Sequence, residues 1–228
     1  MNNAFRDIRY ESSSSEKAPI TLVGSGEVRI NKSLDADFWA YDTRDVQPSI
    51  SLGLIDAAVD TVVRRTIQIH SLIDATQVIQ VESLFRDSRD EKSGAVTISI
   101  NPPSVTIGNC GVAIAEVEFR IDANKAPNNH FGHSYDEEKS ALELDKNEFD
   151  GHITLTSLET GKDIALPFHM LLRKASHTTI SSNQKLPWQP NTKSSTIIEI
   201  TNSGAGVAQI DAFNLIAVSP DQPEASAG

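Results

Sequence analysis

The chain has 228 residues and a formal net charge of -11 at pH 7, from 31 acidic and 20 basic residues. At 39% hydrophobic and 22% charged residues, its composition is that of an ordinary globular protein that can bury a core. The charge argues against nucleic acid as a partner, because binding to a phosphate backbone needs clustered Lys and Arg that displace counterions.

Cysteine usage and hydropathy narrow the class of protein further. Cys110 is the only cysteine, so the chain has no intrachain disulfide framework and no thiolate metal cluster. No run approaches the roughly 20 apolar residues that a membrane-spanning helix needs, and the first residues lack the pattern of a signal peptide. We expect no membrane span, and either a cytosolic protein or a piece of a longer exported one.

The first part of the chain differs from the rest. Residues 1–18 are polar and rich in serine, with too little apolar surface to offset the entropy of ordering, so we interpret them as a loose lead-in. Asn31 is placed to cap a short helix that reaches about residue 36. Leu34 and Phe38 would share one face of it at i and i+4. We expect this helix to dock against the domain that follows.

From residue 48 to residue 172 the pattern is that of β-strands. Ala115, Val117 and Phe119, for example, alternate with charged residues, which is the period of a strand with one buried face. The expected strands lie at residues 48–52, 61–71, 76–85, 96–100, 112–122, 153–155 and 164–166. About seven strands with turns between them and almost no helical period predict an all-β, fibronectin type III-like or immunoglobulin-like sandwich, preceded by the short helix.

Four segments follow from this reading. Residues 1–42 form the lead-in and residues 43–174 the sandwich, whose acidic excursion at residues 123–150 is long enough to project from one end. A polar, proline-containing linker occupies residues 175–194. Residues 195–228 carry two more strands, which cannot form a domain alone and so either join the sandwich or begin a second β domain.

The acidic excursion holds the candidate metal ligands. His130, His133 and Asp136 follow an H-x-x-H-x-x-D spacing, which suits zinc or calcium among the nearby carboxylates. The run that begins at Asp145 imitates a calcium loop but lacks its glycine and has Thr156 in place of the final glutamate. A solvated acidic loop explains the same residues, so we expect no cofactor, with calcium as the alternative.

No local signature of catalysis is present. The sequence has no G-x-S-x-G elbow, and His133 beside Ser134 does not by itself form an attacking pair. Cys110 has no His or Asn near it in the pattern. We therefore expect no catalytic residue in this chain. Trp39 and Trp188 are candidates for stacking on a sugar or for sealing a domain junction.

Three stretches together resemble a known family. They are GSGEV at residues 24–28, PPSVTI at residues 102–107, and DGHITLT at residues 150–156 followed by LPF at residues 166–168. In this order they are similar to the region just after the catalytic domain of bacterial subtilisin-like serine proteases, where a G-x-G-x-V segment opens the last helix of the protease domain and a fibronectin type III-like domain follows. The resemblance covers roughly residues 20–174, with departures at Arg29, Ser33 and the long acidic excursion.

The family's Asp, His and Ser motifs have no counterpart in these 228 residues. The resemblance therefore implies a non-catalytic accessory sandwich of a secreted or cell-surface serine endopeptidase. Its partner would be the protease domain of the same polypeptide, met at a junction formed by Phe38, Trp39 and Tyr41, with a protein substrate or a cell-surface polymer as a further partner. The alternative is a free adhesin-like or carbohydrate-binding sandwich that uses residues 123–150 or an exposed Trp.

Overall fold

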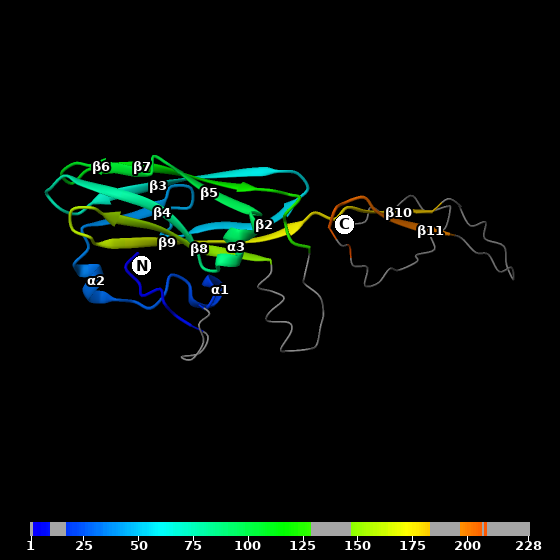
Figure 1. Ribbon diagram of the computed structural model, residues 1–228, viewed down its shortest axis with the longest axis horizontal. Coiled ribbons are helices and arrows are strands. Elements are labelled where there is room, and N and C mark those ends of the chain that lie inside the picture. The colour runs from blue at the N-terminus through cyan, green and yellow to red at the C-terminus, as the bar shows by residue number, and fades with distance from the viewer. Residues whose placement is uncertain (1, 10–16, 129–146, 183–196, 207, 209–228) are drawn as a thin grey trace, which may run out of the picture.

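A computed structural model describes residues 2–9, 17–128, 147–182, 197–206 and 208. Two packed β-sheets, one of four and one of five strands, form a sandwich, and a separate two-stranded ribbon extends beyond one end of it (Figure 1). The expectation of an all-β sandwich with little helix is confirmed.

The four-stranded sheet is antiparallel throughout and has the order β1-β3-β7-β5. Its strands are β1 (Phe38–Asp42), β3 (Thr61–Ser71), β7 (Val112–Ile121) and β5 (Val96–Asn101). The first of these strands lies on the N-terminal side of the sandwich boundary expected at residue 43.

The five-stranded sheet has the order β2-β9-β8-β4-β6, with β2 parallel to β9 and the other pairs antiparallel. Its strands are β2 (Ile50–Ala57), β9 (Asp163–Lys174), β8 (Glu148–Ser157), β4 (Gln77–Phe85) and β6 (Ser104–Ile107). The ribbon consists of β10 (Thr178–Ser182), inside the expected linker, and β11 (Ile198–Asn202).

The helices are short, and the one expected between about residues 31 and 36 is present but ends at Leu34. They are α1 (Ile20–Val23), α2 (Ile30–Leu34) and α3 (Ser88–Ser93). Asn31 lies inside α2 instead of capping it, Leu34 is 84% exposed, and Phe38 belongs to β1. The expected shared helical face is therefore wrong. Alternating residues in β1 are buried, so its two-residue period and its pairing with β3 decide the structure there.

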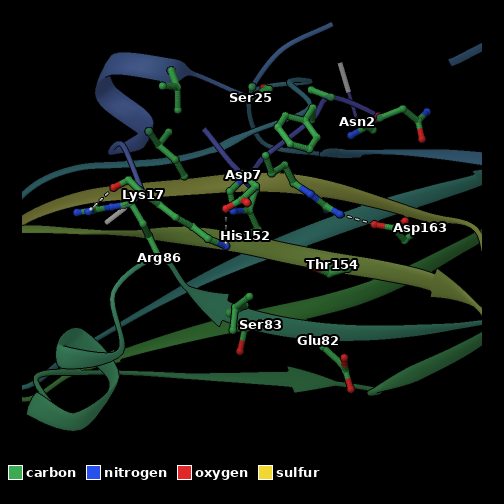
Figure 2. Close-up of a pocket in the computed structure, with 18 of the residues that line it drawn as sticks. Asn2, Asp7, Lys17, Ser25, Glu82, Ser83, Arg86, His152, Thr154 and Asp163 are labelled. Carbon is green, nitrogen blue, oxygen red and sulfur yellow. Dashed lines mark hydrogen bonds and ion pairs between the residues drawn. The ribbon is translucent and has the colours of Figure 1, made fainter. Parts of the chain in front are cut away.

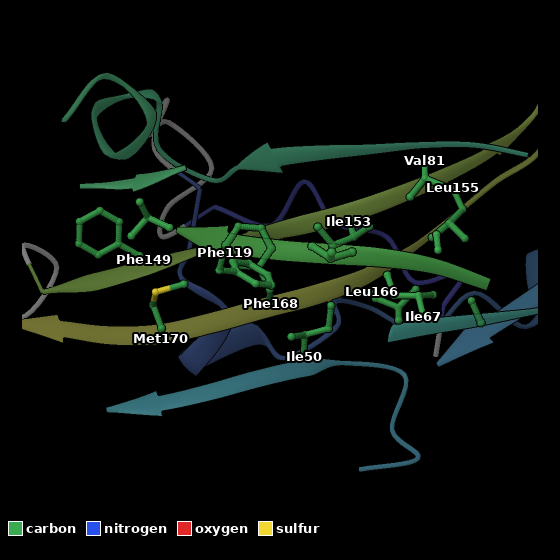
Figure 3. Close-up of a cluster of buried hydrophobic side chains, with 14 of the residues drawn as sticks. Ile50, Ile67, Val81, Phe119, Phe149, Ile153, Leu155, Leu166, Phe168 and Met170 are labelled. Carbon is green, nitrogen blue, oxygen red and sulfur yellow. The ribbon is translucent and has the colours of Figure 1, made fainter. Parts of the chain in front are cut away.

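The core lies between the sheets and follows the alternation seen in the sequence (Figure 3). Phe119 of β7 and Phe168 of β9 meet from opposite sheets with ring centroids 5.5 Å apart and an interplanar angle of 62°. Such edge-to-face contacts add to the energy of burial itself. The other large, fully buried side chains are Phe38, Ile50, Ile67, Ile69, Ile79, Ile107, Ile121, Ile153, Leu155 and Leu166.

One buried charged pair links the two layers. The Nε of Arg65 lies 3.4 Å from the Oδ2 of Asp42, and the Arg65 Nη2 donates to the carbonyl of Ser51 at 3.1 Å. Arg65 thus joins β1 and β3 of one sheet to β2 of the other. Burial raises the pKa of Asp42, since a desolvated carboxylate is harder to ionise.

Candidate functional site

The outer face of the five-stranded sheet is covered by residues 2–9 and 17–34, which we call the N-terminal strap (Figure 1). The main chain of Asn2 accepts a hydrogen bond from the Ala165 N–H at 2.9 Å, and Arg6 forms an ion pair with Asp163. Ala165, on β9, is only 3% exposed as a result. Some residues with outward register on β8 and β9, such as Asp150 and Ala165, are therefore buried.

Asp150 on β8 is the centre of the contacts beneath the strap. Its Oδ1 accepts from the Arg86 Nε at 2.6 Å, and its Oδ2 accepts from the backbone N–H of Ile20 at 2.7 Å. The Asp150 and Arg86 side chains are 0% and 8% exposed. Burial raises the pKa of Asp150, while Arg86 and the Ile20 N–H oppose that rise. This carboxylate anchors α1 to the sheet.

Glu148 holds the next part of the strap. Its Oε1 accepts from the Thr21 Oγ1 at 2.7 Å and lies 3.2 Å from the Nε2 of His169. Burial alone would raise the pKa of Glu148, but the contacts with His169 and Thr21 outweigh it, so that the pKa lies below its usual value. Both buried carboxylates of β8 are thus engaged in holding the strap.

His152 lies next to this network and faces a cleft of about 980 Å³ between the strap, β4 and β5 (Figure 2). Burial first, and then the charges of Arg6 and Lys17, lower its pKa to about 4. The imidazole is therefore neutral near pH 7. Ser83 and Thr154 line the same cleft.

The outer face of the four-stranded sheet carries an aromatic cluster. The Trp39 ring stacks on His70 with centroids 4.5 Å apart and on Tyr41 with centroids 5.3 Å apart. Trp39 is directly opposite His70 in the β1–β3 register, which explains the first contact. Trp39 is 41% exposed.

Aliphatic side chains continue this surface. His70 pairs in register with Val112 of β7, and Gln68 pairs with Ile114. Val112 is 52% and Ile114 56% exposed, and Leu72, just after β3, is 54% exposed. We call this surface the aromatic face; it consists of Trp39, Tyr41, His70, Leu72, Val112 and Ile114.

The opposite end of the same sheet face is charged. Arg64 of β3 donates to Glu118 of β7 at 2.7 Å and lies 3.6 Å from Glu116. Hydrogen bonds from Arg120 and Arg64 lower the pKa of Glu118. The contiguous apolar surface thus lies at the end of the sheet near β1, and Val62 is an isolated exposed apolar residue at the charged end.

The structure separates the residues expected at a domain junction. Phe38 is fully buried and belongs to the core, whereas Trp39 and Tyr41 stack on the outer face. The junction itself stays a prediction. His70 was not connected with these residues from sequence. The strand register brings it opposite Trp39, and the one available signal was its outward position in the alternation of β3.

The candidate metal ligands His130, His133 and Asp136, and also Trp188, lie outside the described residues. Within the described ranges, no group of three or more His, Cys, Asp or Glu side chains is arranged to hold a metal ion. Asp150, part of the calcium-loop imitation, is an element of β8 bound to Arg86.

Comparisons with known proteins identify no family for this chain. No protein-family model matches the sequence, and no curated protein matches it. The chain is similar to a FixG-related protein from Vibrio parahaemolyticus, with 8% identity and a TM-score of 0.35, over 59% of this chain and 93% of that one. It is also similar to a PapD-like domain of human CEP192, with 9% identity and a TM-score of 0.35, over 61% and 87%.

A third similar structure is the Escherichia coli chaperone DraB, with 12% identity and a TM-score of 0.31, over 60% of this chain and 55% of that one. None of these three is a subtilisin-like protease, and no sequence relative supports that family. The resemblance to the region after a subtilisin-like catalytic domain is therefore wrong. The chain is a β-sandwich module.

Local packing explains why one of the resembling motifs is present. A Cβ on Gly151 would lie 2.2 Å from the Leu84 carbonyl oxygen and 2.8 Å from the Phe168 ring, so the Asp-Gly pair of β8 meets a steric need. A sandwich can meet such a need without any relationship to the protease family.

Among the described residues, no helix is both long and apolar enough to span a membrane.

Proposed function

We propose that this chain is a non-catalytic, adhesin-like binding module that holds a neutral carbohydrate polymer against its aromatic face. The observation that carries the proposal is the stack of Trp39, Tyr41 and His70 on an outer sheet face, continuous with exposed aliphatic side chains. A protein gains no stability from leaving such a surface in water, and contiguous exposed apolar patches mark interaction sites.

The chemistry of the aromatic face suits a sugar ring. The ring faces of Trp and Tyr carry partial negative charge, which attracts the C–H bonds on the apolar side of a pyranose. Sugar hydroxyls need hydrogen-bonding partners at the edge of the stack. Gln68 lies there, with its Nε2 3.0 Å from the Nε2 of His70, and its amide oxygen is an acceptor.

Charge narrows the polymer class. With a formal net charge of -11, the chain repels polyanions, so a neutral polysaccharide fits better than an acidic one. Neutral structural polysaccharides lie in cell walls and outside cells, and the proposal includes a secreted or surface location where the chain would meet one. The proposed partner is therefore a neutral polymer of a cell surface.

Intrinsic fluorescence tests the proposal, because the chain has two tryptophans and Trp188→Phe leaves Trp39 as the sole reporter. This variant is titrated with a panel of soluble neutral polysaccharides, namely xylan, mixed-linkage β-glucan and galactomannan. We expect saturable quenching or a spectral shift with at least one of them. Absence of any saturable change across the panel would contradict the proposal.

A matched pair of variants locates the surface. Trp39→Ala removes the centre of the stack. In affinity electrophoresis, polysaccharide in the gel should slow the parent protein but not this variant. Val62→Ala alters another exposed apolar residue, 46% exposed, at the charged end of the same sheet, and should be retarded like the parent. Equal retardation of both variants would place binding elsewhere.

A further inference from the structure

The cleft beside the N-terminal strap contains an unpaired strand edge. β6 pairs with β4 only along residues 77–80, and no described strand continues that pairing toward Phe85. β6 begins at Ser104, directly after Pro102 and Pro103, and a proline has no N–H with which to extend a ladder. The last bond at this edge runs from the Val81 N–H to the Pro103 carbonyl, at 2.9 Å.

Backbone alternation shows which groups of β4 face this edge. The Arg86 N–H donates to the Asp150 carbonyl, and the Leu158 N–H donates to the Val78 carbonyl, both at 2.9 Å. Because bonding direction alternates along an antiparallel strand, the even-numbered residues of β4 bond to β8. The N–H and C=O groups of Ser83 and Phe85 therefore point to the free edge.

β5 forms a second wall of the cleft, and it too has backbone groups that pair with no described strand. The Asp122 N–H donates to the Ala95 carbonyl at 2.9 Å, so by the same alternation Ile98 and Ile100 turn their backbone groups away from β7. Their side chains are half-buried and line the cleft. An extended chain beside β4 would thus meet apolar surface on one side.

The strap supplies the opposite wall, which is rich in cations. Five cationic residues line the cleft, namely Arg6, Lys17, Arg29, Lys32 and Arg86, against three acidic ones, namely Asp7, Glu82 and Asp163. The whole chain has the reverse balance, 20 basic to 31 acidic residues. The charges of Arg6 and Lys17 help to lower the pKa of His152, so both act on the cleft even though Arg6 pairs with Asp163 and the Lys17 Nζ lies 3.9 Å from the Asp7 Oδ1.

We propose that this cleft binds an extended peptide segment of another protein, which adds as a strand to the free edge of β4 at residues 82–85. Its apolar side chains pack on Ile98 and Ile100, and its alternate, acidic side chains face Arg6 and Lys17 of the strap. In this mode main-chain hydrogen bonds supply affinity and alternate side chains supply specificity. The site is separate from the aromatic face, so the proposal does not depend on carbohydrate binding.

The test uses the intact chain and a fluorescein-labelled octapeptide of alternating valine and glutamate, with anisotropy as the readout. We expect saturable binding, and weaker binding when lysine replaces every glutamate. Two further peptides carry N-methyl groups on all valines or on all glutamates. Pairing along one edge uses alternate amides, so one of these two should lose about ten-fold in affinity and the other should not.

Two charge variants locate the peptide on the protein. Lys17→Glu should weaken binding of the acidic peptide. Lys92 is an exposed cation of α3 outside the cleft, so Lys92→Glu should leave the affinity for this peptide unchanged. Trp39→Ala should bind the peptide like the parent. Four results would each overturn the proposal: no saturable binding of the acidic peptide, equal binding of the lysine peptide, equal effects of the two N-methylated peptides, or equal effects of the two charge variants.

Discussion

The two outer faces of this sandwich invert the usual relation between polarity and burial. On the five-stranded sheet, Glu148 and Asp150 face outward and are buried, because the strap and Arg86 satisfy them. On the four-stranded sheet, Trp39 and Ile114 face outward and are exposed. Burial here therefore depends on which face the strap covers, and contiguous exposed apolar surface of the kind left bare is typical of binding sites.

The largest expected effect comes from breaking the buried pair under the strap. Asp150→Ala leaves the Arg86 guanidinium buried without its carboxylate, which should lower the free energy of unfolding by about 3–5 kcal/mol. Glu118→Ala is the matched change on the bare face, where its partner Arg64 is 59% exposed, and should lower the free energy of unfolding much less, because water screens an exposed pair. Urea unfolding of both variants measures the difference. Equal losses in the free energy of unfolding would contradict the claim that the buried pair under the strap contributes more to stability than the pair on the bare face.

His152 gives the covered face a pH dependence. Its pKa is about 4 in the folded chain and 6.5 when unfolded, so between these values the unfolded state binds the proton and the folded state does not. Stability should therefore fall as pH decreases from 6.5 to 4, by about 2–3 kcal/mol from this residue.

His152→Gln removes that group and keeps a polar side chain. The difference in unfolding free energy between the variant and the parent should shift in the variant's favour as pH falls through this window. Denaturant unfolding at several pH values measures it. A difference that stays constant with pH would mean that the imidazole is not held neutral beneath the strap.

The smallest stability effect is expected on the aromatic face. Trp39→Ala removes two ring stacks but leaves no buried cavity, and should cost about 1 kcal/mol or less. Thermal unfolding measures this change. A loss as large as that of Asp150→Ala would mean that Trp39 is structural and not available to a ligand.

Alternation in the sequence predicted the fold well where it was long. The 11 residues of β3 and the 10 of β7 show it clearly, and their inward residues Ile67 and Phe119 are fully buried. β1 was missed because its five residues follow helix signals and its period is visible only once it pairs with β3. The contact between Ile20 and Asp150 spans 130 positions and has no local signal at all.

The candidate site was predictable only in part. Trp39 and Tyr41 could be singled out as large aromatic residues near a boundary, but their stacking with His70 depends on strand register, which the sequence does not encode locally. The unpaired edge of β4 was equally hidden, although the adjacent Pro102 and Pro103 marked where a strand must end. The protease resemblance failed because short strand and turn motifs arise from packing needs such as that of Gly151.

The most direct test of the account compares Trp39→Ala and His152→Gln, one variant on each face, in isothermal titration with the polysaccharide that the parent binds. Trp39→Ala should lose about ten-fold or more in affinity, as expected for a central aromatic contact, and His152→Gln should bind like the parent. Loss of affinity in His152→Gln with Trp39→Ala unaffected would contradict the claim that the bare aromatic face is the binding surface.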